Sequence, residues 1–288
     1  MWFKNCVSNT KNKLINIHQI SSIVSYYLQS QTKYRVHSPL VFDFIENVFE
    51  DVRQYYAFEK IERLRTKLLK DEKTIKMVDF GAGSKTNNAK EKKVREIAAT
   101  SLTNKQFGEI LFKLVSHYKP KTILELGTSL GLATTYLAMP SPETSRLITL
   151  EGNPGVAKVA AANFEAFHLK NIELIEGQFE QTLATVLNKV DQLDLVFFDG
   201  NHQKAPTLAY FEACLAKAHE DSIFVFDDIY WSSGMTAAWK ELKLHPSVSH
   251  SIDIFQFGLL FFKKNMDKPQ HTQLIEHKWK PWSAGFFK

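Results

Sequence analysis

The sequence predicts an α/β fold preceded by a helical extension, and three observations support this prediction. From about residue 106 onward, short apolar segments alternate with amphipathic helical segments. A glycine-containing turn follows the first of these apolar segments. Near the C-terminal end, two apolar segments follow each other without room for a helix between them. Together these features indicate a mostly parallel sheet that ends in an antiparallel hairpin.

The region 1–104 is expected to be a helical extension. Apolar residues at helical spacing predict helices over residues 14–30 and 58–70. Between them, Ser38 and Pro39 are a typical helix start, because a hydroxyl N-cap is followed by proline at the first helical position. Three roles stay open for the extension: a cap over one sheet edge, a substrate lid or a dimer arm.

The region after the extension is expected to contain βαβ units. Strands are predicted at 122–127, 147–151, 172–175, 193–199 and 222–227, with helices at 107–118, after Gly131, and at 154–168, 179–189, 204–219 and 233–243. Parallel strands need such crossover helices, which cover both faces of the sheet. Residues 250–258 and 259–262 are two further strands that form an antiparallel hairpin. The prediction is a Rossmann-like, seven-stranded mixed sheet, mostly parallel, with an antiparallel last strand and flanking helices.

We therefore divide the chain into the extension 1–104, a core domain 105–264 and a C-terminal tail 265–288. The extension also contains a second strand–glycine turn, from Met77 to Ser84, but a polar, lysine-rich stretch follows it. A cofactor-binding turn normally leads into a helix that packs on the sheet. We interpret 81–93 as a polar loop, with a lid or an anion-contacting loop as the alternative.

The composition is typical of a globular protein, with 288 residues, 44% hydrophobic residues and a formal net charge of +5. This charge is compatible with an anionic small substrate as well as with nucleic acid. The two cysteines, Cys6 and Cys214, have no metal-ligand spacing and favour a reducing compartment. No signal peptide and no run of roughly 20 apolar residues is present, so we expect a cytoplasmic protein without a membrane span.

The most informative motif is the turn after the first core strand, Glu125-Leu126-Gly127-Thr128-Ser129-Leu130-Gly131. Gly127 allows a positive φ and a close approach of a ligand to the backbone, and Gly131 allows tight packing of the following helix. Turns that bind dinucleotides carry a middle glycine that makes room for pyrophosphate. Ser129 occupies that position here. The turn therefore favours a nucleoside cofactor without a pyrophosphate.

Polar side chains follow the strands at one edge of the predicted sheet. Glu151 ends the second core strand, where a carboxylate can accept hydrogen bonds from a ribose diol. Because ligands of such sheets bind at the carboxyl ends of the strands, we expect these side chains to converge. Helix capping or solvation is the alternative for any one of them. The residues are Glu125, Glu151, Glu176, Asp199, Asp227 and Asp228.

At this point the chain resembles the class I S-adenosylmethionine-dependent methyltransferases, over roughly residues 105–263. Within that class it is most similar to the cation-dependent O-methyltransferases of the catechol O-methyltransferase type. The motifs that carry the resemblance are Glu125–Gly131, Leu150-Glu151-Gly152, Phe198-Asp199-Gly200-Asn201-His202 and Phe226-Asp227-Asp228.

The resemblance implies S-adenosylmethionine as the cofactor and Mg²⁺ as a further cofactor. The expected metal ligands are Asp199, Asp227 and Asp228, although the catechol enzymes usually carry asparagine at the position of Asp228. Three carboxylates in one place need a divalent cation or a basic side chain to offset their charge. The expected cofactor-binding residues are Glu125, Gly127, Thr128, Ser129, Gly131, Glu151, Gly152, Gly177, Gln178, Phe179 and Asp199.

His202 is the candidate general base, and Asp199 is expected to act with it. His202 stands where the resembling enzymes carry a lysine, and histidine can take a hydroxyl proton near neutral pH. The alternative is a histidine satisfied at the start of the next helix. Trp231 follows the acidic pair and either lines the acceptor site or packs against a helix start.

The sequence thus predicts an enzyme that transfers a methyl group from S-adenosylmethionine to a hydroxyl oxygen of a small molecule. A methyltransferase acting on RNA or protein is the alternative, with nucleic acid the less favoured partner. A NAD-dependent oxidoreductase is disfavoured by Ser129 and by the terminal hairpin. A cofactor-binding module without catalysis also stays open. The N-terminal helices are expected to form a homodimer contact.

Overall fold

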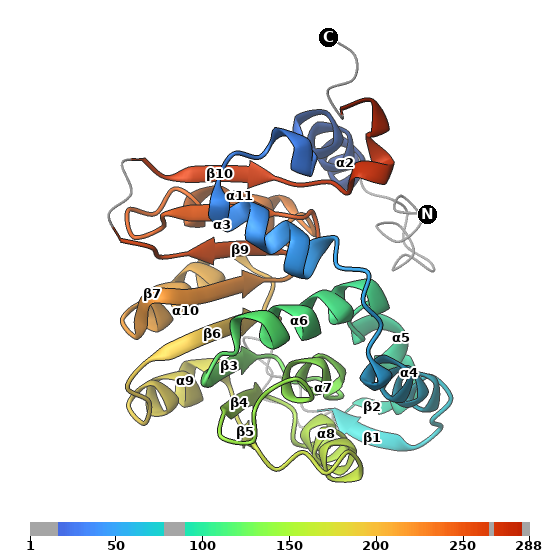
Figure 1. The fold of residues 1–288 in the computed structure, drawn as a ribbon. Coiled ribbons are helices and arrows are strands. Elements are labelled where there is room, and N and C mark those ends of the chain that lie inside the picture. Colours follow the sequence, from blue (N-terminus) through green and yellow to red (C-terminus); the bar gives the residue numbers. More distant parts are fainter. Residues whose placement is uncertain (1–16, 78–89, 265–267, 284–288) are drawn as a thin grey trace. The chain divides into compact units, whose positions relative to one another are not determined.

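The computed structural model describes residues 17–77, 90–264 and 268–283, and Figure 1 draws its fold. Its residues group into two compact units. The first unit contains Met1–Asp51 and Phe197–Lys288, and the second contains Val52–Val196. The predicted domain boundaries at residues 104 and 264 do not coincide with the boundaries of these units. The division into an extension, a core domain and a tail stays a prediction.

The second unit contains the parallel part of the sheet. Its strands follow the order β6-β3-β4-β5, and β6 continues into the first unit. In register, Leu124 lies opposite Ile148, and Leu147 lies opposite Ile172. Leu124, Leu147 and Ile148 are buried, as the apolar runs predict, whereas Ile172 on the edge strand is half-buried. The strands are β3 (Thr122–Leu126), β4 (Arg146–Glu151), β5 (Ile172–Glu176) and β6 (Leu193–Phe198).

Helices of the second unit precede and connect these strands, and local capping fixes the starts of two of them. The Asn104 side chain accepts a hydrogen bond from the backbone N–H of Gln106, and Asn153 accepts from Gly155 and Val156. The helices are α4 (Tyr56–Leu68), α5 (Val94–Ser101), α6 (Lys105–Tyr118), α7 (Leu132–Ala138), α8 (Pro154–Ala166) and α9 (Phe179–Leu187). The sequence analysis did not predict α5.

A two-stranded antiparallel sheet in the second unit joins β1 (Thr74–Met77) and β2 (Lys90–Lys93). The strand at Met77 was expected. Residues 90–93 were predicted as part of a polar loop and instead form a strand. Residues 78–89, which include the second glycine turn, lie outside the described residues.

The first unit contains the antiparallel part of the sheet, in the order β10-β8-β9-β7-β6 (Figure 1). β9 is antiparallel to both β7 and β8, which confirms the predicted hairpin. β10 pairs in parallel with β8. The strands are β7 (Ala218–Phe226), β8 (His250–Asp253), β9 (Gly258–Phe261) and β10 (Gln270–Gln273).

The predicted α/β class is therefore confirmed, but the strand number is corrected from seven to eight. The additional strand is β10, which lies in the region predicted as a tail. Its sequence, Gln270-His271-Thr272-Gln273, is polar. An edge strand needs a partner on one side only and does not need the apolar pattern of a buried strand.

The helical elements of the first unit lie at its N-terminal segment, between its strands and at its C-terminal segment. The predicted helix over 14–30 is present as α2, and the helix that begins at Pro39 continues as a π-helical turn, η2. The elements are α2 (Ile17–Gln29), η1 (Lys33–Arg35), α3 (Pro39–Phe44), η2 (Ile45–Phe49), α10 (Lys204–Leu215), α11 (Ser233–Leu242), η3 (His277–Trp279) and η4 (Pro281–Ser283).

Aromatic side chains dominate the core of the first unit. The rings of Phe198 and Phe226 stack with their centroids 4.3 Å apart. Trp239 is 2% exposed, and a Cβ atom at Gly258 would lie 2.6 Å from its ring. Only glycine therefore allows the start of β9 to lie against this tryptophan.

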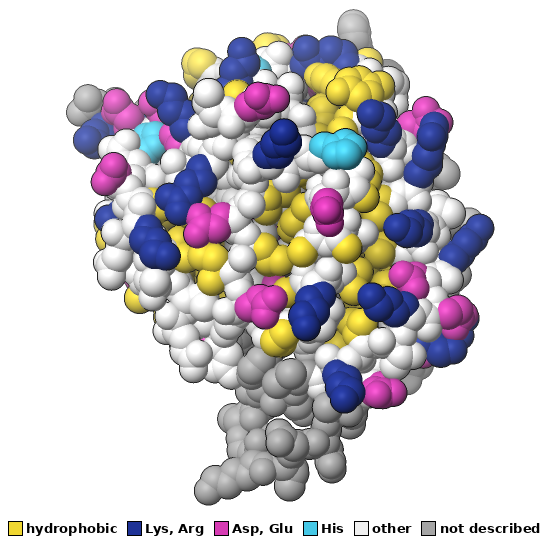
Figure 2. All heavy atoms as spheres, turned by 90° about the horizontal axis from the view of Figure 1, so that it is seen from below, with side chains coloured by type: hydrophobic (Ala, Val, Ile, Leu, Met, Phe, Trp, Pro, Cys, Tyr) yellow, Lys and Arg dark blue, Asp and Glu magenta, His cyan; other side chains and the backbone are white. Residues whose placement is uncertain are grey.

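The face drawn in Figure 2 carries Lys and Arg side chains interspersed with Asp and Glu side chains. Proteins that bind nucleic acid normally gather their basic residues into one patch or stripe. This face therefore offers no support for the nucleic-acid alternative. Residues 85–89 of the lysine-rich stretch lie outside the described residues.

Candidate functional site

The glycine turn after β3 has an unusual backbone. Gly127, Ser129 and Gly131 have φ values of 112°, 48° and 81°. The backbone N–H groups of Gly127 and Thr128 both donate to the carbonyl of Leu150, at 3.0 and 3.1 Å, and so tie the turn to β4. A left-handed conformation at a residue with a side chain costs on the order of 1 kcal/mol, so the strain at Ser129 indicates a functional turn.

Gly131 acts as predicted, by allowing close packing at the start of α7. A Cβ atom at this position would lie 2.5 Å from the ring of Phe164 on α8. Its positive φ also favours glycine. The turn therefore keeps its shape only with glycine at this position.

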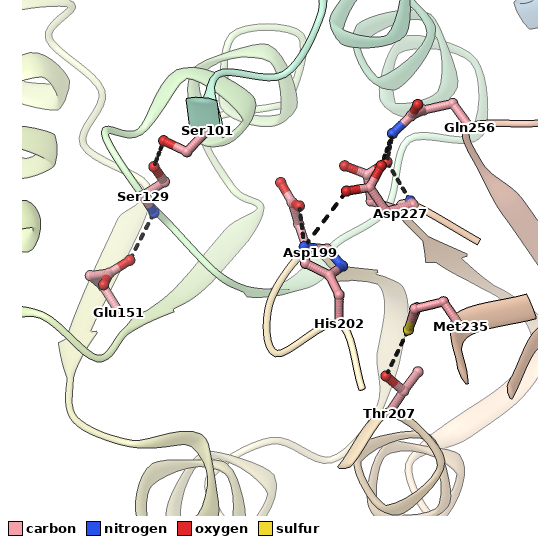
Figure 3. Close-up of polar contacts among 10 residues, drawn as sticks. Ser101, Ser129, Glu151, Asp199, His202, Thr207, Asp227, Met235 and Gln256 are labelled. Atoms are coloured by element: carbon pink, nitrogen blue, oxygen red, sulfur yellow. Dashed lines mark hydrogen bonds and ion pairs between the residues drawn. The ribbon is translucent and has the colours of Figure 1, made fainter. Parts of the chain in front are cut away.

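Glu151 ends β4 beside this turn, and the turn holds its carboxylate. Oε2 accepts a hydrogen bond from the backbone N–H of Ser129 at 2.8 Å (Figure 3). Oε1 accepts one from the backbone N–H of Asn153 at 2.8 Å. Burial raises the pKa of Glu151, while the N–H groups of Asn153, Ser129 and Gly152 oppose that rise. A carboxylate has about four acceptor positions, so this fixed group keeps capacity for a ligand diol.

Glu125 lies in the interior of the second unit and is 0% exposed. Its Oε2 accepts hydrogen bonds from the hydroxyls of Thr134 and Thr149 at 2.5 and 2.6 Å. Oε1 is buried and has no hydrogen-bond partner among the residues that the structure describes. Burial raises the pKa of Glu125 to about 7, against the effect of these two hydroxyls. Buried polar atoms are normally hydrogen-bonded, so this oxygen is a candidate acceptor next to the turn.

The residues after β5 border Glu151 as well. The backbone N–H of Gly177 donates to the carbonyl of Glu151 at 2.9 Å, and Gly177 has a φ of 142°. Gln178 is the N-cap residue of α9, and Phe179 is its first residue. The structure thus places the predicted loop 177–179 at the same end of the parallel strands as Glu151.

The sequence analysis missed Ser101. Its hydroxyl pairs with that of Ser129 at 2.9 Å and thereby joins the end of α5 to the glycine turn (Figure 3). No motif indicates this contact, because α5 itself was not predicted. Ser101 is a further residue that holds the turn in place.

The second group of predicted residues lies in the first unit, after β6 and β7. The Nε2 atom of His202 lies 3.7 Å from Oδ1 of Asp199 and 3.9 Å from Oδ2 of Asp228 (Figure 3). Asp227 is 7% exposed, and its side chain is hydrogen-bonded to that of Asp199. α10 has Gln203 as its N-cap residue, so His202 lies before the helix. The four predicted side chains are therefore brought together.

The electrostatics of this group follow from its burial. Burial and, next, the negative charge of Asp228 raise the pKa of Asp227 above the usual aspartate value. Hydrogen bonds from Gln256 and with Asp199 oppose that rise. A carboxyl group with a raised pKa can donate a proton to a neighbouring carboxylate, which allows two acids to lie together.

Gln256, which the sequence analysis also missed, completes this group. Its Nε2 atom donates to Oδ1 of Asp227 at 2.5 Å and to Oδ1 of Asp228 at 2.6 Å (Figure 3). It comes from the turn between β8 and β9. A lone glutamine in a hairpin turn carries no recognisable signal.

This arrangement does not fit the predicted Mg²⁺. Carboxylate oxygens are suitable ligands, but they would have to surround one point at about 2.0–2.1 Å. An amide nitrogen lies between the two neighbouring carboxylates instead. Among the described residues, no group of three or more His, Cys, Asp or Glu side chains is arranged to hold a metal ion. We therefore derive no step through Mg²⁺.

Comparison with known proteins identifies the part of the chain that carries these residues. Residues 124–229 match a family model described as "Methyltransferase domain". The chain carries a methyltransferase domain over these residues. The match begins within β3 and ends just after β7, so it includes the predicted site residues from Glu125 to Asp228 but neither Ser101 nor Gln256.

Curated relatives of this methyltransferase domain are catechol O-methyltransferases. The enzyme of Mycobacterium tuberculosis is 29% identical over 133 residues, which cover 46% of this chain and 59% of the relative. The enzyme of Niastella koreensis is 31% identical over 124 residues, which cover 42% of this chain and 55% of the relative. The chain thus matches less than two thirds of the length of either relative.

Solved structures share the fold of the methyltransferase domain. An O-methyltransferase from Bacillus cereus in complex with SAH has a TM-score of 0.54 and 19% identity, and covers 77% of this chain and 97% of its own. The O-methyltransferase TomG from Streptomyces achromogenes in complex with SAM has a TM-score of 0.53 and 19% identity, and covers 74% of this chain and 92% of its own. These structures share the fold of the chain, and the sequence similarity to catechol O-methyltransferases covers less than half of it.

Proposed function

We propose that this protein is an S-adenosylmethionine-dependent methyltransferase that methylates a hydroxyl oxygen of a small molecule. The observation that carries the proposal is the Glu151 carboxylate, held by the N–H of Ser129 beside the strained glycine turn. The O-methyltransferase relatives and the SAM- or SAH-bound structural neighbours support it.

The residues of the glycine turn fit this cofactor. Glu151 would accept hydrogen bonds from the ribose hydroxyls, and the backbone from Gly127 to Ser129 would lie against the methionine part. Gly152 and the loop 177–179 border Glu151 and would contact the nucleoside. The unsatisfied Oε1 atom of Glu125 offers an acceptor behind the turn. When bound, S-adenosylmethionine supplies a methyl group on a positively charged sulfur.

His202 would act as general base for the acceptor. Its Nε2 atom would take the hydroxyl proton of the acceptor, which makes the oxygen a better nucleophile. Asp199 and Asp228, which lie within 4 Å of Nε2, would stabilise the positive charge that the imidazole gains. General bases of this kind contribute about 10²–10⁴-fold to a rate.

The acceptor is the part of the proposal that an experiment must define. Tritium-labelled S-adenosylmethionine incubated with panels of phenols, sugars and RNA measures which class takes up the label. We expect label in small molecules with hydroxyl groups. Labelling of RNA alone would replace the proposal by the macromolecular alternative.

A dinucleotide cofactor is disfavoured because the side chain of Ser129 stands where a middle glycine would make room for pyrophosphate.

The predicted homodimer and the predicted location belong to this proposal. α2 has an exposed apolar face formed by Ile20, Val24 and Leu28, which are 49%, 50% and 73% exposed. The helix contains no charged residue, so two copies of the face would not repel each other.

Within the described part of the chain, no helix has the length and apolarity needed to cross a membrane. A cytoplasmic location stays a prediction, which cell fractionation tests.

A further inference from the structure

Gln256 sits in a hairpin turn whose shape is strongly fixed. The N–H of Ile254 donates to the carbonyl of Phe257 at 2.9 Å, and Gln256 N–H donates to that of Ile254 at 3.0 Å. Phe255 adopts a φ of 73°, which costs on the order of 1 kcal/mol for a residue with a side chain.

Burial of the Phe255 side chain offsets this strain. Its ring stacks on that of Tyr230 with centroids 5.0 Å apart, and it meets the ring of Tyr26 edge-on at 5.2 Å. Oδ1 of Asp253 accepts a hydrogen bond from the N–H of Phe255 at 2.9 Å. The turn is therefore held in one conformation, and this conformation directs Gln256 toward the acidic pair.

The contacts of Gln256 determine which end of its amide faces the acids. Oδ1 of Asp227 also accepts the backbone N–H of Asp228, at 2.7 Å. Two carboxylate oxygens facing the amide need a donor that carries two protons, and only the NH₂ end supplies it. The amide oxygen in that place would add a third acceptor next to two others. The amide nitrogen therefore lies between the two acids because both carboxylate oxygens accept a hydrogen bond from it.

We propose that Gln256 takes the place of a divalent cation in this site. Its NH₂ group bridges Asp227 and Asp228, Asp199 is hydrogen-bonded to Asp227, and His202 lies beside Asp199 and Asp228. The Gln256 amide occupies Oδ1 of both acids, at the point where a bridging metal ion would lie, so the wild-type protein does not bind Mg²⁺ or Mn²⁺ at the acidic pair. Where the proposed methyl transfer operates, it proceeds without a divalent cation.

Only the last statement depends on the proposed function, and the cation-binding claim is tested without it. Mn²⁺ is titrated into the wild-type protein, Gln256→Glu, Gln256→Ala and the control Gln270→Ala, and free Mn²⁺ is measured by electron paramagnetic resonance. Gln270 is an exposed glutamine at the start of β10 of the same unit. Near-ultraviolet circular dichroism checks that each variant is folded.

We expect saturable Mn²⁺ binding in the folded Gln256 variants, at least about tenfold tighter than in the wild type and in Gln270→Ala, where it should not saturate. Gln256→Glu keeps the size of the side chain and adds a carboxylate ligand, so it serves where Gln256→Ala does not fold. Saturable binding to the wild type that is lost in Asp228→Ala would overturn the proposal. Absence of binding in a folded Gln256→Glu variant would equally overturn it, because Gln256 would then not be what excludes the cation.

Catalysis is compared separately, with the chelator EDTA present and absent. Equal rates support the metal-free reaction. Loss of the rate with EDTA and recovery with Mg²⁺ would contradict it. If no methyl transfer occurs under either condition, the proposed function fails, while the Mn²⁺ titration still decides the role of Gln256.

Discussion

At the scale of single residues, two carboxylates of neighbouring strands have different roles. Glu151 ends β4 and is fixed by backbone N–H groups, whereas Glu176 lies opposite it in register at the end of β5 and is exposed. A variant of Glu176 is therefore a matched control for a variant of Glu151, because it changes an exposed carboxylate at the same end of the sheet.

We predict that Glu151→Gln weakens binding of S-adenosylhomocysteine by about 10–100-fold, because hydrogen bonds to a charged group contribute about 1.5–3 kcal/mol. Isothermal titration calorimetry measures the affinity. Glu176→Gln is the control and should bind like the wild type. Equal affinities for all three proteins would remove Glu151 from the cofactor site.

His202 is predicted to act on the reaction rather than on the cofactor. His202→Gln should lower turnover by at least about 100-fold, in keeping with the contribution of a general base, and leave the affinity for S-adenosylhomocysteine within about twofold. Steady-state kinetics and calorimetry measure the two quantities, with His168→Gln, just after α8, as the control. Unchanged turnover would show that His202 has a structural role only.

Glu125 should make folding stability depend on pH. Its pKa is about 7 in the folded protein and near 4.5 in the unfolded chain, so the folded protein keeps a proton that the unfolded chain loses between these values. The contribution of Glu125 to stability is complete below pH 4.5 and falls as pH rises to 7, by about 3 kcal/mol in total.

Urea denaturation of the wild type and of Glu125→Gln at a series of pH values tests this prediction. The stability of the wild type relative to the variant should decrease from pH 4.5 to 7 and then stay constant. Glu176→Gln, at an exposed acid, should follow the wild type. Parallel curves for the wild type and Glu125→Gln would mean that Glu125 ionises in the folded protein as it does in the unfolded chain.

At the scale of elements, the sequence predicts best the helices and strands whose own residues specify their type and position. The buried strands β3, β4, β6 and β7 are apolar runs, and Asn153 with Pro154 marks the start of α8. α5 was missed because it has only eight residues, and β10 because a polar edge strand lacks an apolar pattern. Their existence depends on tertiary contacts that a single sequence does not display.

At the scale of elements, we predict that the exposed apolar face of α2 forms the homodimer contact. Val24→Asp places a charge in the proposed dimer contact and should convert a wild-type dimer into a monomer, as measured by sedimentation velocity. Val52→Asp is the matched control, because Val52 is 85% exposed and lies outside α2. A monomeric wild type, or equal dissociation by both variants, would contradict a dimer through α2.

At the scale of the whole molecule, each of the two groups of site residues contains strand ends that a motif can reveal and a residue that no motif reveals. The glycine turn, Glu151, Asp199, His202 and the acidic pair follow strands and could be found from the sequence. Ser101 and Gln256 could not, since each reaches its partner only through the fold. The arrangement at the acidic pair could not be predicted for the same reason, because Gln256, which bridges the two acids, follows them by 29 and 28 residues in the sequence.

The central claim is that the glycine turn and Glu151 bind S-adenosylmethionine rather than a dinucleotide. The most direct measurement is the thermal unfolding midpoint of the wild-type protein with S-adenosylhomocysteine and, separately, with NAD. A ligand that binds only the folded state stabilises it by about 2.7 kcal/mol at 100 times its dissociation constant. We predict a raised midpoint with S-adenosylhomocysteine and no change with NAD. A raised midpoint with NAD alone would contradict the account.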